Sequence, residues 1–217
     1  MKVIGKVHSP FKEKFGIPRQ GNLIDIPMSI EILPPYNREE AFFGLEKFSH
    51  AIIIFQFHHV LESEEKLSVR PPRLGGNTHQ GVFATRSPYR PNRLGFSVVK
   101  LSNVQKDKIE IIGGDFLDQT PVLDIKPYLP YSDSIKDASG SWTQKLDEKK
   151  LQVTFECNFD HISSAEKNWV EQILSFDPRP TFHQDEKKDY SVKLFNYDFK
   201  FNICADQLTI TEIKSLN

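Results

Sequence analysis

The sequence predicts a mainly β fold of the α+β class, in which a large domain of short strands is followed by a small α+β domain. Apolar and polar side chains alternate over short stretches in the first two thirds of the chain, which is the pattern of half-buried strands. A polar stretch at residues 131–150 interrupts this pattern. Beyond it, one helical pattern lies among several strand patterns, and this mixture indicates a second domain of a different kind.

The clearest strand pattern covers residues 24–32, where apolar side chains alternate with polar ones. Pro27 lies inside it and cannot donate a backbone hydrogen bond, so we expect it at a sheet edge or a bulge. Residues 51–57 form a continuous apolar run rich in β-branched side chains, which is typical of a strand covered on both faces. Such short strands separated by turns indicate a barrel or a sandwich. The further strands are expected at residues 81–85, 96–101 and 109–112.

One helix is predicted in the first domain. It begins at Asn37, whose side chain can cap the first turn while Glu40 lies three residues later. Its apolar face would cover one side of the sheet. That face carries Ala41, Phe42, Leu45 and Phe48.

The polar stretch is the expected domain junction, which divides the chain into residues 1–135 and 136–217. The second domain begins with a strand pattern at residues 151–159. Ser163 and Glu166 then form a capping box, and the helix that they start ends before Pro178. A domain of about 65 to 70 residues is near the lower size limit, so we expect it to lean on the first. Its remaining strands are expected at residues 189–195, 197–203 and 208–213, with a tight turn near Asn196.

Composition excludes several classes of protein. The chain has 217 residues, with 28 basic and 29 acidic side chains, so it does not coat nucleic acid through bulk charge. Any contact with RNA must use a local patch. Cys157 and Cys204 form no metal or redox motif and suit a reducing compartment. The sequence holds no apolar run of membrane-spanning length, and we expect a cytoplasmic protein with no membrane and no metal partner.

The segment at residues 70–101 concentrates arginine among proline and glycine. Arginine presents a planar fork of donors suited to carboxylate and phosphate, and neighbouring proline lowers the entropy lost when the fork is oriented. The segment therefore resembles an anion-binding surface, although a solvated basic loop has the same composition. Its arginines are Arg70, Arg73, Arg86, Arg90 and Arg93.

This segment and three others resemble one family. The residues are IGKVHSPFKEKFGIPRQ (4–20), GLEKFSHAIIIFQFHH (44–59), RPPRLGGNTHQGVFATRSPYRPNRLG (70–95) and DFLDQTPVLDIKPYLP (115–130). In this order they are similar to the TsaA/TrmO family of S-adenosylmethionine-dependent tRNA methyltransferases. Gln119 stands where the family more often has glycine, so we expect the turn before Thr120 to differ.

The resemblance implies a β-barrel-like first domain that binds S-adenosylmethionine outside a Rossmann fold. The chain itself has no G-x-G-x-x-G after a strand and no P-loop, which agrees with this implication. The implied reaction methylates N6 of threonylcarbamoyladenosine at position 37 of tRNA, in a homodimer with its active site near the subunit interface. The implied cofactor-binding residues are Pro18, Arg19, Gln20, His58, His59, Arg86, Leu94, Asp124, Ile125, Lys126 and Pro127.

These residue types suit the cofactor. Arg86 or Arg19 could hold the carboxylate, and Asp124 could accept hydrogen bonds from the ammonium or the ribose. Asp124 is also a weak candidate for the proton acceptor, and equally for the polar side of a half-buried strand. His58 and His59 follow a strand, so we expect at most one of them to face the pocket. Phosphates of the tRNA are assigned to Arg73, Arg90 and Arg93.

Two other functions stay open at this point. A non-catalytic RNA-binding or regulatory β-barrel would explain the arginines equally well, and it predicts no affinity for S-adenosylmethionine. A methyltransferase with a different acceptor is the second, since fold and cofactor do not fix the substrate.

Overall fold

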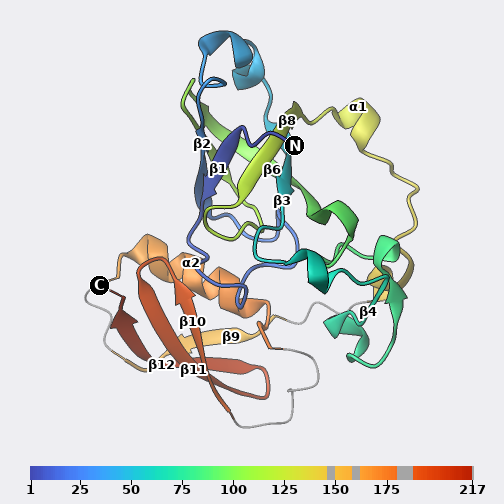
Figure 1. Cartoon of the computed structure of the whole chain (residues 1–217). Helices are drawn as coiled ribbons and strands as arrows, with labels where there is room; N and C mark the ends of the chain where they lie inside the picture. Colours follow the sequence, from blue (N-terminus) through green and yellow to red (C-terminus); the bar gives the residue numbers. More distant parts are fainter. Residues whose placement is uncertain (146–149, 158–161, 180–187, 217) are drawn as a thin grey trace.

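The computed structural model describes residues 1–145, 150–157, 162–179 and 188–216, and all side chains in these ranges except those of Arg73 and Lys145 (Figure 1). A closed ring of strands is built from the first 127 residues, and a four-stranded sheet with one long helix follows from residue 152 onward. The predicted mainly β, α+β fold is therefore confirmed.

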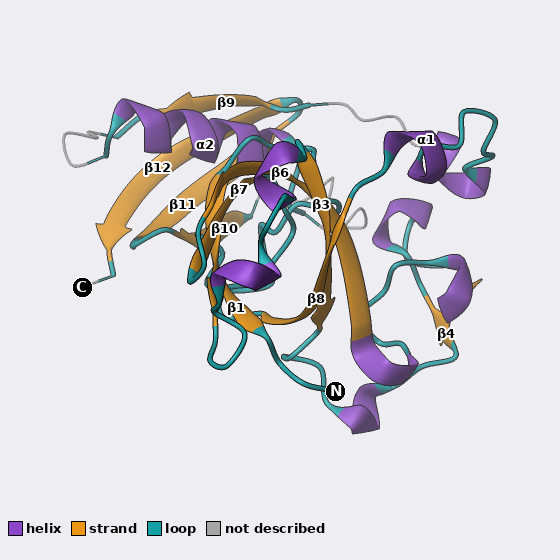
Figure 2. Cartoon of the chain, turned by 90° about the horizontal axis from the view of Figure 1, so that it is seen from above, coloured by secondary structure: helices purple, strands orange, loops and turns teal. Residues whose placement is uncertain are grey.

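Six antiparallel strands form the ring, in the order β1-β2-β7-β6-β3-β8. It closes because β8 pairs with β1, where Gly5 faces Val122 and Lys6 faces Pro121. Figure 2 looks down on the ring and shows the strands enclosing its interior. The strands are β1 (Gly5–His8), β2 (Pro27–Ile32), β3 (His50–Gln56), β6 (Leu94–Val104), β7 (Lys108–Ile112) and β8 (Pro121–Pro127).

Alternation decides which side chains fill the ring. Every second residue of β2 and β3 is buried, as in the pattern of a sheet with one face in the core. The other residues of β3 are half-buried, so the prediction of cover on both faces holds only in part. Pro27 is the first residue of β2 and not at an edge or a bulge, since a strand's first residue tolerates a missing donor.

Two predicted elements are wrong. The helix from Asn37 is replaced by two 3₁₀ helices, Glu39–Ala41 and Leu45–Lys47. Gly44 lies between them with a φ of 87°, a left-handed conformation that ends a helix, and Phe43 points to solvent with 78% of its surface exposed.

The strand predicted at residues 81–85 is also absent. Only β5 (Gln80–Gly81) is extended there, paired with β4 (Ser68–Val69), and a 3₁₀ helix follows at Val82–Ala84. The carbonyls of Val82 and Thr85 accept hydrogen bonds from the Arg90 guanidinium, so they are turned away from any neighbouring strand. Other short helices are α1 (Pro130–Asp133) and 3₁₀ helices at Glu62–Glu64, Pro72–Leu74, Pro91–Arg93 and Ser141–Lys145.

The small domain follows the sequence prediction closely. Its sheet has the order β10-β11-β12-β9, and β9 runs parallel to β12. The capping box is confirmed, because Ser163 Oγ accepts from the Glu166 amide at 3.2 Å while the Glu166 carboxylate accepts from the Ser163 amide at 2.9 Å. Residues 158–159 of the first predicted strand lie outside the described residues. The elements are β9 (Gln152–Phe155), α2 (Ser164–Ser175), β10 (Asp189–Leu194), β11 (Tyr197–Cys204) and β12 (Gln207–Ser215).

The two parts share one hydrophobic core. Phe11 and Ile24, which lie between β1 and β2, belong to the same cluster of buried residues as Val170 of α2 and Leu194 of β10. The small domain thus leans on the large one, as its size predicts. Among the helices that the structure describes, none is long and apolar enough to cross a membrane.

The first testable prediction concerns Gly95, which faces Phe55 across the β3–β6 pair. A Cβ there would lie 2.3 Å from the Phe55 ring, which is itself packed edge-on against Phe116 at 5.0 Å. Gly95→Ala should therefore lower the free energy of unfolding by about 1–3 kcal/mol, as overpacking does.

Gly81 is the matched control, because its φ is −59° and a Cβ would meet nothing within 4 Å. Gly81→Ala should leave stability unchanged or raise it by about 0.4–1 kcal/mol. Urea unfolding of both variants measures the difference, and equal stabilities would contradict the packing argument.

Candidate functional site

A pocket of about 430 Å³ lies at one end of the strand ring. Neighbouring strands are antiparallel, so the ends of β1 and β3 and the starts of β6 and β8 meet at the same end. The segments attached there supply the walls. They are residues 14–20 after β1, residues 55–60 at the end of β3, residues 86–96 before and in β6, and residues 115–120 before β8.

Arg86 is held at the pocket by two neighbours. Its Nη1 donates a hydrogen bond to the Gln20 side-chain oxygen, and its guanidinium lies 5.4 Å from the centre of the Phe96 ring. Gln20 in turn donates from Nε2 to the Arg19 carbonyl. Because Gln20 and Phe96 come from different lining segments, Arg86 links those segments and presents a pre-oriented cation.

Asp115 is the one carboxylate among the described residues that line the pocket. It accepts a hydrogen bond from Ser97 Oγ. Burial raises the pKa of this carboxyl above its usual range, and the Ser97 hydrogen bond and the Arg86 charge only partly offset that effect. Our sequence predictions missed Asp115. The available signal was the preceding Gly113-Gly114 pair, whose positive φ values of 79° and 136° bend the backbone into the site.

Both histidines line the pocket, so the expectation that at most one would face it is wrong. β3 ends at Gln56, and the strand alternation no longer applies at His58 and His59. Their rings pack edge to face with centres 4.4 Å apart. Burial, followed by the neighbouring charge of His59, lowers the pKa of His58. The His59 carbonyl accepts from Lys14 Nζ at 2.8 Å, which ties two pocket walls together.

The structure brings seven of the eleven predicted cofactor-binding residues together. Pro18, Arg19, Gln20, His58, His59, Arg86 and Leu94 line the pocket. The four from β8 do not line it, namely Asp124, Ile125, Lys126 and Pro127.

On β8, the Asp124 and Lys126 side chains form an ion pair and are 45% and 56% exposed. An exposed pair of this kind is screened by solvent and contributes little to stability. These side chains are therefore accessible on the outside of the ring.

Two of the three predicted tRNA-binding arginines, Arg90 and Arg93, are hydrogen-bonded to other groups of the chain. Arg90 donates to the carbonyls of Ser87, Val82 and Thr85, and it is half-buried. Arg93 donates to the Val60 carbonyl at 2.9 Å and pairs with Glu62 at 3.0 Å. The side chain of Arg73 lies outside the described residues. Arg90 and Arg93 thus brace the loop that forms one wall of the pocket.

No cluster of three or more metal-ligating side chains occurs in the part of the chain that the structure describes. The ionisable groups of the pocket are instead arginine, lysine, histidine and a single carboxylate, beside the neutral polar side chains of Gln20 and Thr120. This set suits an organic ligand that carries both an anionic and a cationic group.

Known proteins are similar to this chain over both of its parts. A family model described as the tRNA-methyltransferase O N-terminal domain matches residues 6–134, and one described as the TrmO C-terminal domain matches residues 148–216. The chain is 40% identical over 214 residues to a tRNA (adenine(37)-N6)-methyltransferase of Escherichia coli, covering 92% of this chain and 91% of that protein. It is also 40% identical to a putative S-adenosylmethionine-dependent methyltransferase of Pseudomonas aeruginosa, over 90% and 88% of the two chains.

Solved structures are similar over the same length. A crystal structure of TrmO superposes with a TM-score of 0.81 at 33% identity and covers 99% of both chains. One of TrmO from Pseudomonas aeruginosa superposes with a TM-score of 0.78 at 31% identity, again over 99% of each chain.

The second testable prediction uses the buried charge of Asp115. A carboxyl whose pKa is raised in the folded chain costs stability when ionised, and this cost grows as pH rises from its ordinary value near 3.8 through the raised value. Asp115→Asn should therefore raise the melting temperature relative to the parent protein at pH 7.5, and by less at pH 4.5.

Asp118 provides a control of opposite sign. Burial acts to raise its pKa, but the Lys12 hydrogen bond and the Ser9 amide outweigh burial and lower it. Its charge therefore stabilises the fold above the ordinary pKa near 3.8, and Asp118→Asn should lower the melting temperature at pH 7.5 and at pH 4.5 alike. Thermal unfolding of both variants at the two pH values tests the pair. A gain for Asp115→Asn that shrinks with rising pH would contradict the burial of its charge.

Proposed function

The chain belongs to the tRNA-methyltransferase O (TrmO) family, and from this premise we propose that it methylates N6 of threonylcarbamoyladenosine at position 37 of tRNA. The broader activity, S-adenosylmethionine-dependent methylation of tRNA, follows from the family and from the names of its relatives. The threonylcarbamoyl group on the target base is the finer part of the proposal. Its main support is the match over both parts of the chain, at 40% identity to an adenine-37 enzyme.

The pocket fits the cofactor. S-adenosylmethionine carries a carboxylate, an ammonium, a ribose diol and an adenine, so it needs mixed partners. We propose Arg86 and Arg19 for the carboxylate and Asp115 for the ammonium or the ribose hydroxyls. The apolar side chains of Phe57, Leu94 and others offer surfaces for the adenine. A volume of about 430 Å³ is of the size that organic ligands occupy.

Bound there, S-adenosylmethionine supplies an electrophilic methyl group. The residues of the chain contribute mainly by orientation, which is worth on the order of 7–11 kcal/mol in the best-aligned reactions. The acceptor N6 carries a proton that must leave, and the pocket offers Asp115 and His58 to accept it. We therefore transfer the proposed acceptor role from Asp124, which does not line the pocket, to these two residues.

We propose that tRNA binds over the arginine-rich segment at residues 70–95. A base in an anticodon loop is already unpaired and can stack on aromatic side chains. Phe83 is 80% exposed on this segment and Phe96 is 46% exposed at the pocket. Arg90 and Arg93 would then support tRNA by holding the shape of the segment, since their donors already serve backbone carbonyls and Glu62. We propose Arg70 and Arg73 for direct contact with phosphate, and Arg70 also donates from Nε to His79 Nε2 at 2.9 Å.

A homodimer is the second finer proposal. The family resemblance assigns Asp124 to Pro127 to the cofactor, yet in a single chain they lie outside the pocket. A second copy that approaches with its β8 would supply these residues in trans. Tyr131 and Ile135, which follow β8, are 87% and 72% exposed and offer apolar surface for such a contact.

We also propose a domain boundary near residue 135, consistent with the limits of the two family models. A cytoplasmic location is proposed as well, since tRNA is modified there.

The third testable prediction separates this function from a non-catalytic RNA-binding module. Calorimetric titration should show S-adenosylmethionine binding to the parent protein, and Arg86→Ala should weaken it by about 1.5–3 kcal/mol, the usual worth of a charged hydrogen bond. Arg38→Ala is the control. Arg38 comes directly before the 3₁₀ helix Glu39–Ala41, where its side chain lies near Glu40, and it does not line the pocket.

Mass analysis of nucleosides from treated tRNA then identifies the product. Methylated threonylcarbamoyladenosine is expected, and a different methylated nucleoside would assign another acceptor. A parent protein that binds tRNA but shows no heat with S-adenosylmethionine would favour the binding module.

The fourth prediction tests residues supplied in trans. Light scattering should give twice the chain mass of 25.0 kDa. With S-adenosylmethionine kept below its dissociation constant, Arg86→Ala and Asp124→Ala should each have little activity alone, whereas co-expression of the two should restore about a quarter of the parent activity. Random pairing makes half of the dimers mixed, and each mixed dimer has one site with both residues intact.

A co-expressed pair of Arg86→Ala and His58→Ala chains is the control, since both residues line the same pocket of one chain and no intact site can form. Equal activity in the two mixtures, or a monomeric active protein, would contradict the shared site.

A further inference from the structure

One segment of the large domain folds onto the edge of the small domain. After β1, the backbone of Phe11 pairs with Leu194, and the Phe195 amide donates to the Pro10 carbonyl at 2.9 Å. The Lys193 amide donates to the Glu13 carboxylate, also at 2.9 Å. Because β10 is the edge strand of its sheet, these contacts cover an edge that would otherwise present free backbone groups.

The next residues of the segment have two faces. Phe15 stacks on Tyr190 and on Phe201, with ring centres 6.4 and 6.5 Å apart and planes within 11° and 9° of parallel. Gly16 lies on Val192 so closely that a Cβ would come within 2.6 Å of Val192 Cγ2. Lys14 and residues 17–20 line the pocket instead. Residues 14–20 therefore contact the small domain on one face and line the pocket on the other.

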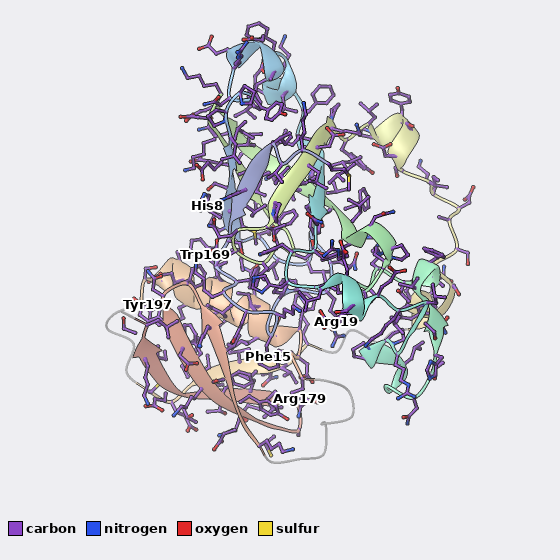
Figure 3. The ribbon with its side chains drawn as sticks, viewed as in Figure 1. His8, Phe15, Arg19, Trp169, Arg179 and Tyr197 are labelled. Atoms are coloured by element: carbon purple, nitrogen blue, oxygen red, sulfur yellow. The ribbon has the colours of Figure 1, made fainter. Side chains whose placement is uncertain are left out.

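A second group of contacts holds the far end of the segment. Arg19 donates to the Asp177 carbonyl at 3.5 Å, just after α2. Asp177 has a φ of 45°, and its carboxylate accepts from the Arg179 guanidinium at 2.9 and 2.8 Å. Arg179 is 6% exposed, so this pair is shielded from solvent. Figure 3 shows Phe15 and Arg179 at the boundary between the two parts, with Arg19 close by.

From these contacts we propose that the small domain positions the cofactor pocket. Its strand β10 would be the surface that fixes the backbone of residues 14–20, and we call this surface the seat. The proposal rests on the proposed function, since it takes the pocket to bind S-adenosylmethionine. Tyr190, Val192 and Phe201 are then positioning residues, which act through the segment and touch no ligand. The seat fixes the backbone from which Pro18, Arg19 and Gln20 reach the pocket, and Gln20 passes this restraint to Arg86.

The fifth prediction is a rescue experiment. Gly16→Ala places a methyl group against Val192 Cγ2 and should raise the dissociation constant for S-adenosylmethionine about tenfold, as a displaced contact residue does. Adding Val192→Ala removes that atom and leaves the Val192 Cβ at 3.9 Å, an ordinary contact. The double variant should recover most of the affinity, although the Gly16 φ of 85° keeps some strain in alanine.

Val153→Ala is the matched control for the second substitution. Val153 is the same residue type on β9, the opposite edge of the same sheet. Combined with Gly16→Ala it should recover nothing. Parent-like affinity in Gly16→Ala, or equal affinities in the two double variants, would overturn the proposal.

Hydrogen exchange without cofactor gives an independent readout. The amides of Lys193 and Phe195, which donate to the Glu13 carboxylate and the Pro10 carbonyl, should exchange faster in Gly16→Ala and return toward the parent rate with Val192→Ala. Phe15→Leu, which keeps apolar volume but loses the ring stack, should show the same acceleration if Gly16→Ala fails to fold. Unchanged exchange in both would overturn the seat. A parent protein without affinity for S-adenosylmethionine would instead overturn the proposed function, while the exchange data would still decide whether β10 seats the segment.

Discussion

The hydrogen bonds between residues 7–12 and 116–120 close the strand ring, and the pocket depends on this closure. The Val7 amide donates to the Thr120 carbonyl, and the Gln119 amide donates back to the Val7 carbonyl. Further along, Ser9 Oγ donates to the Phe116 carbonyl at 2.7 Å. This pairing places the segment after β1 beside the segment before β8, although about a hundred residues separate them in the chain. Without this pairing, Asp115 and residues 14–20 would not come together at one end of the ring.

Closure also explains how a nearly neutral chain builds a strongly polar pocket. The formal net charge of the chain is −1, yet the lining gathers Lys14, three arginines and two histidines around one carboxylate. Such crowding costs free energy unless the charges are paired or hydrogen-bonded. Arg90 is hydrogen-bonded to three backbone carbonyls, and Asp115 accepts a hydrogen bond from Ser97. Arg19 and Arg86 are exposed, so hydration offsets the cost of their charges.

Sequence patterns predicted elements well where local rules decide the structure. The capping box at Ser163 and the strands of the small sheet appear as the alternation and the capping rules require. The patterns failed where a distant or single residue overrides them. Gly44 divides the predicted helix, and Arg90 turns the carbonyls of residues 82–85 away from strand pairing. At Gln119, where the family more often has glycine, the backbone has a φ of 63°. Gln119 therefore adopts the left-handed conformation that glycine favours.

The candidate site was predictable to the extent that family motifs carry it. Those motifs identified seven lining residues but placed the β8 residues in the same group, because a motif does not state which side of a strand faces a ligand or which copy of a chain supplies it. Asp115 escaped for a different reason. Its significance lies in burial, and burial arises only when Ser97, Gly21 and Gly114 close around it in three dimensions.

The small domain illustrates the same limit at a larger scale. Its sequence predicts the strands but not their order, which leaves β10 at an edge of the sheet, and an uncovered edge is a liability in any sheet. Residues 10–13 cover that edge, and residues 15 and 16 pack on its face. The covering is mutual, because a segment with Pro10, Gly16 and Pro18 has little secondary structure of its own and takes its shape from the surface beneath it. Since the next residues of that segment line the pocket, the packing that protects the small sheet also determines where the pocket wall lies.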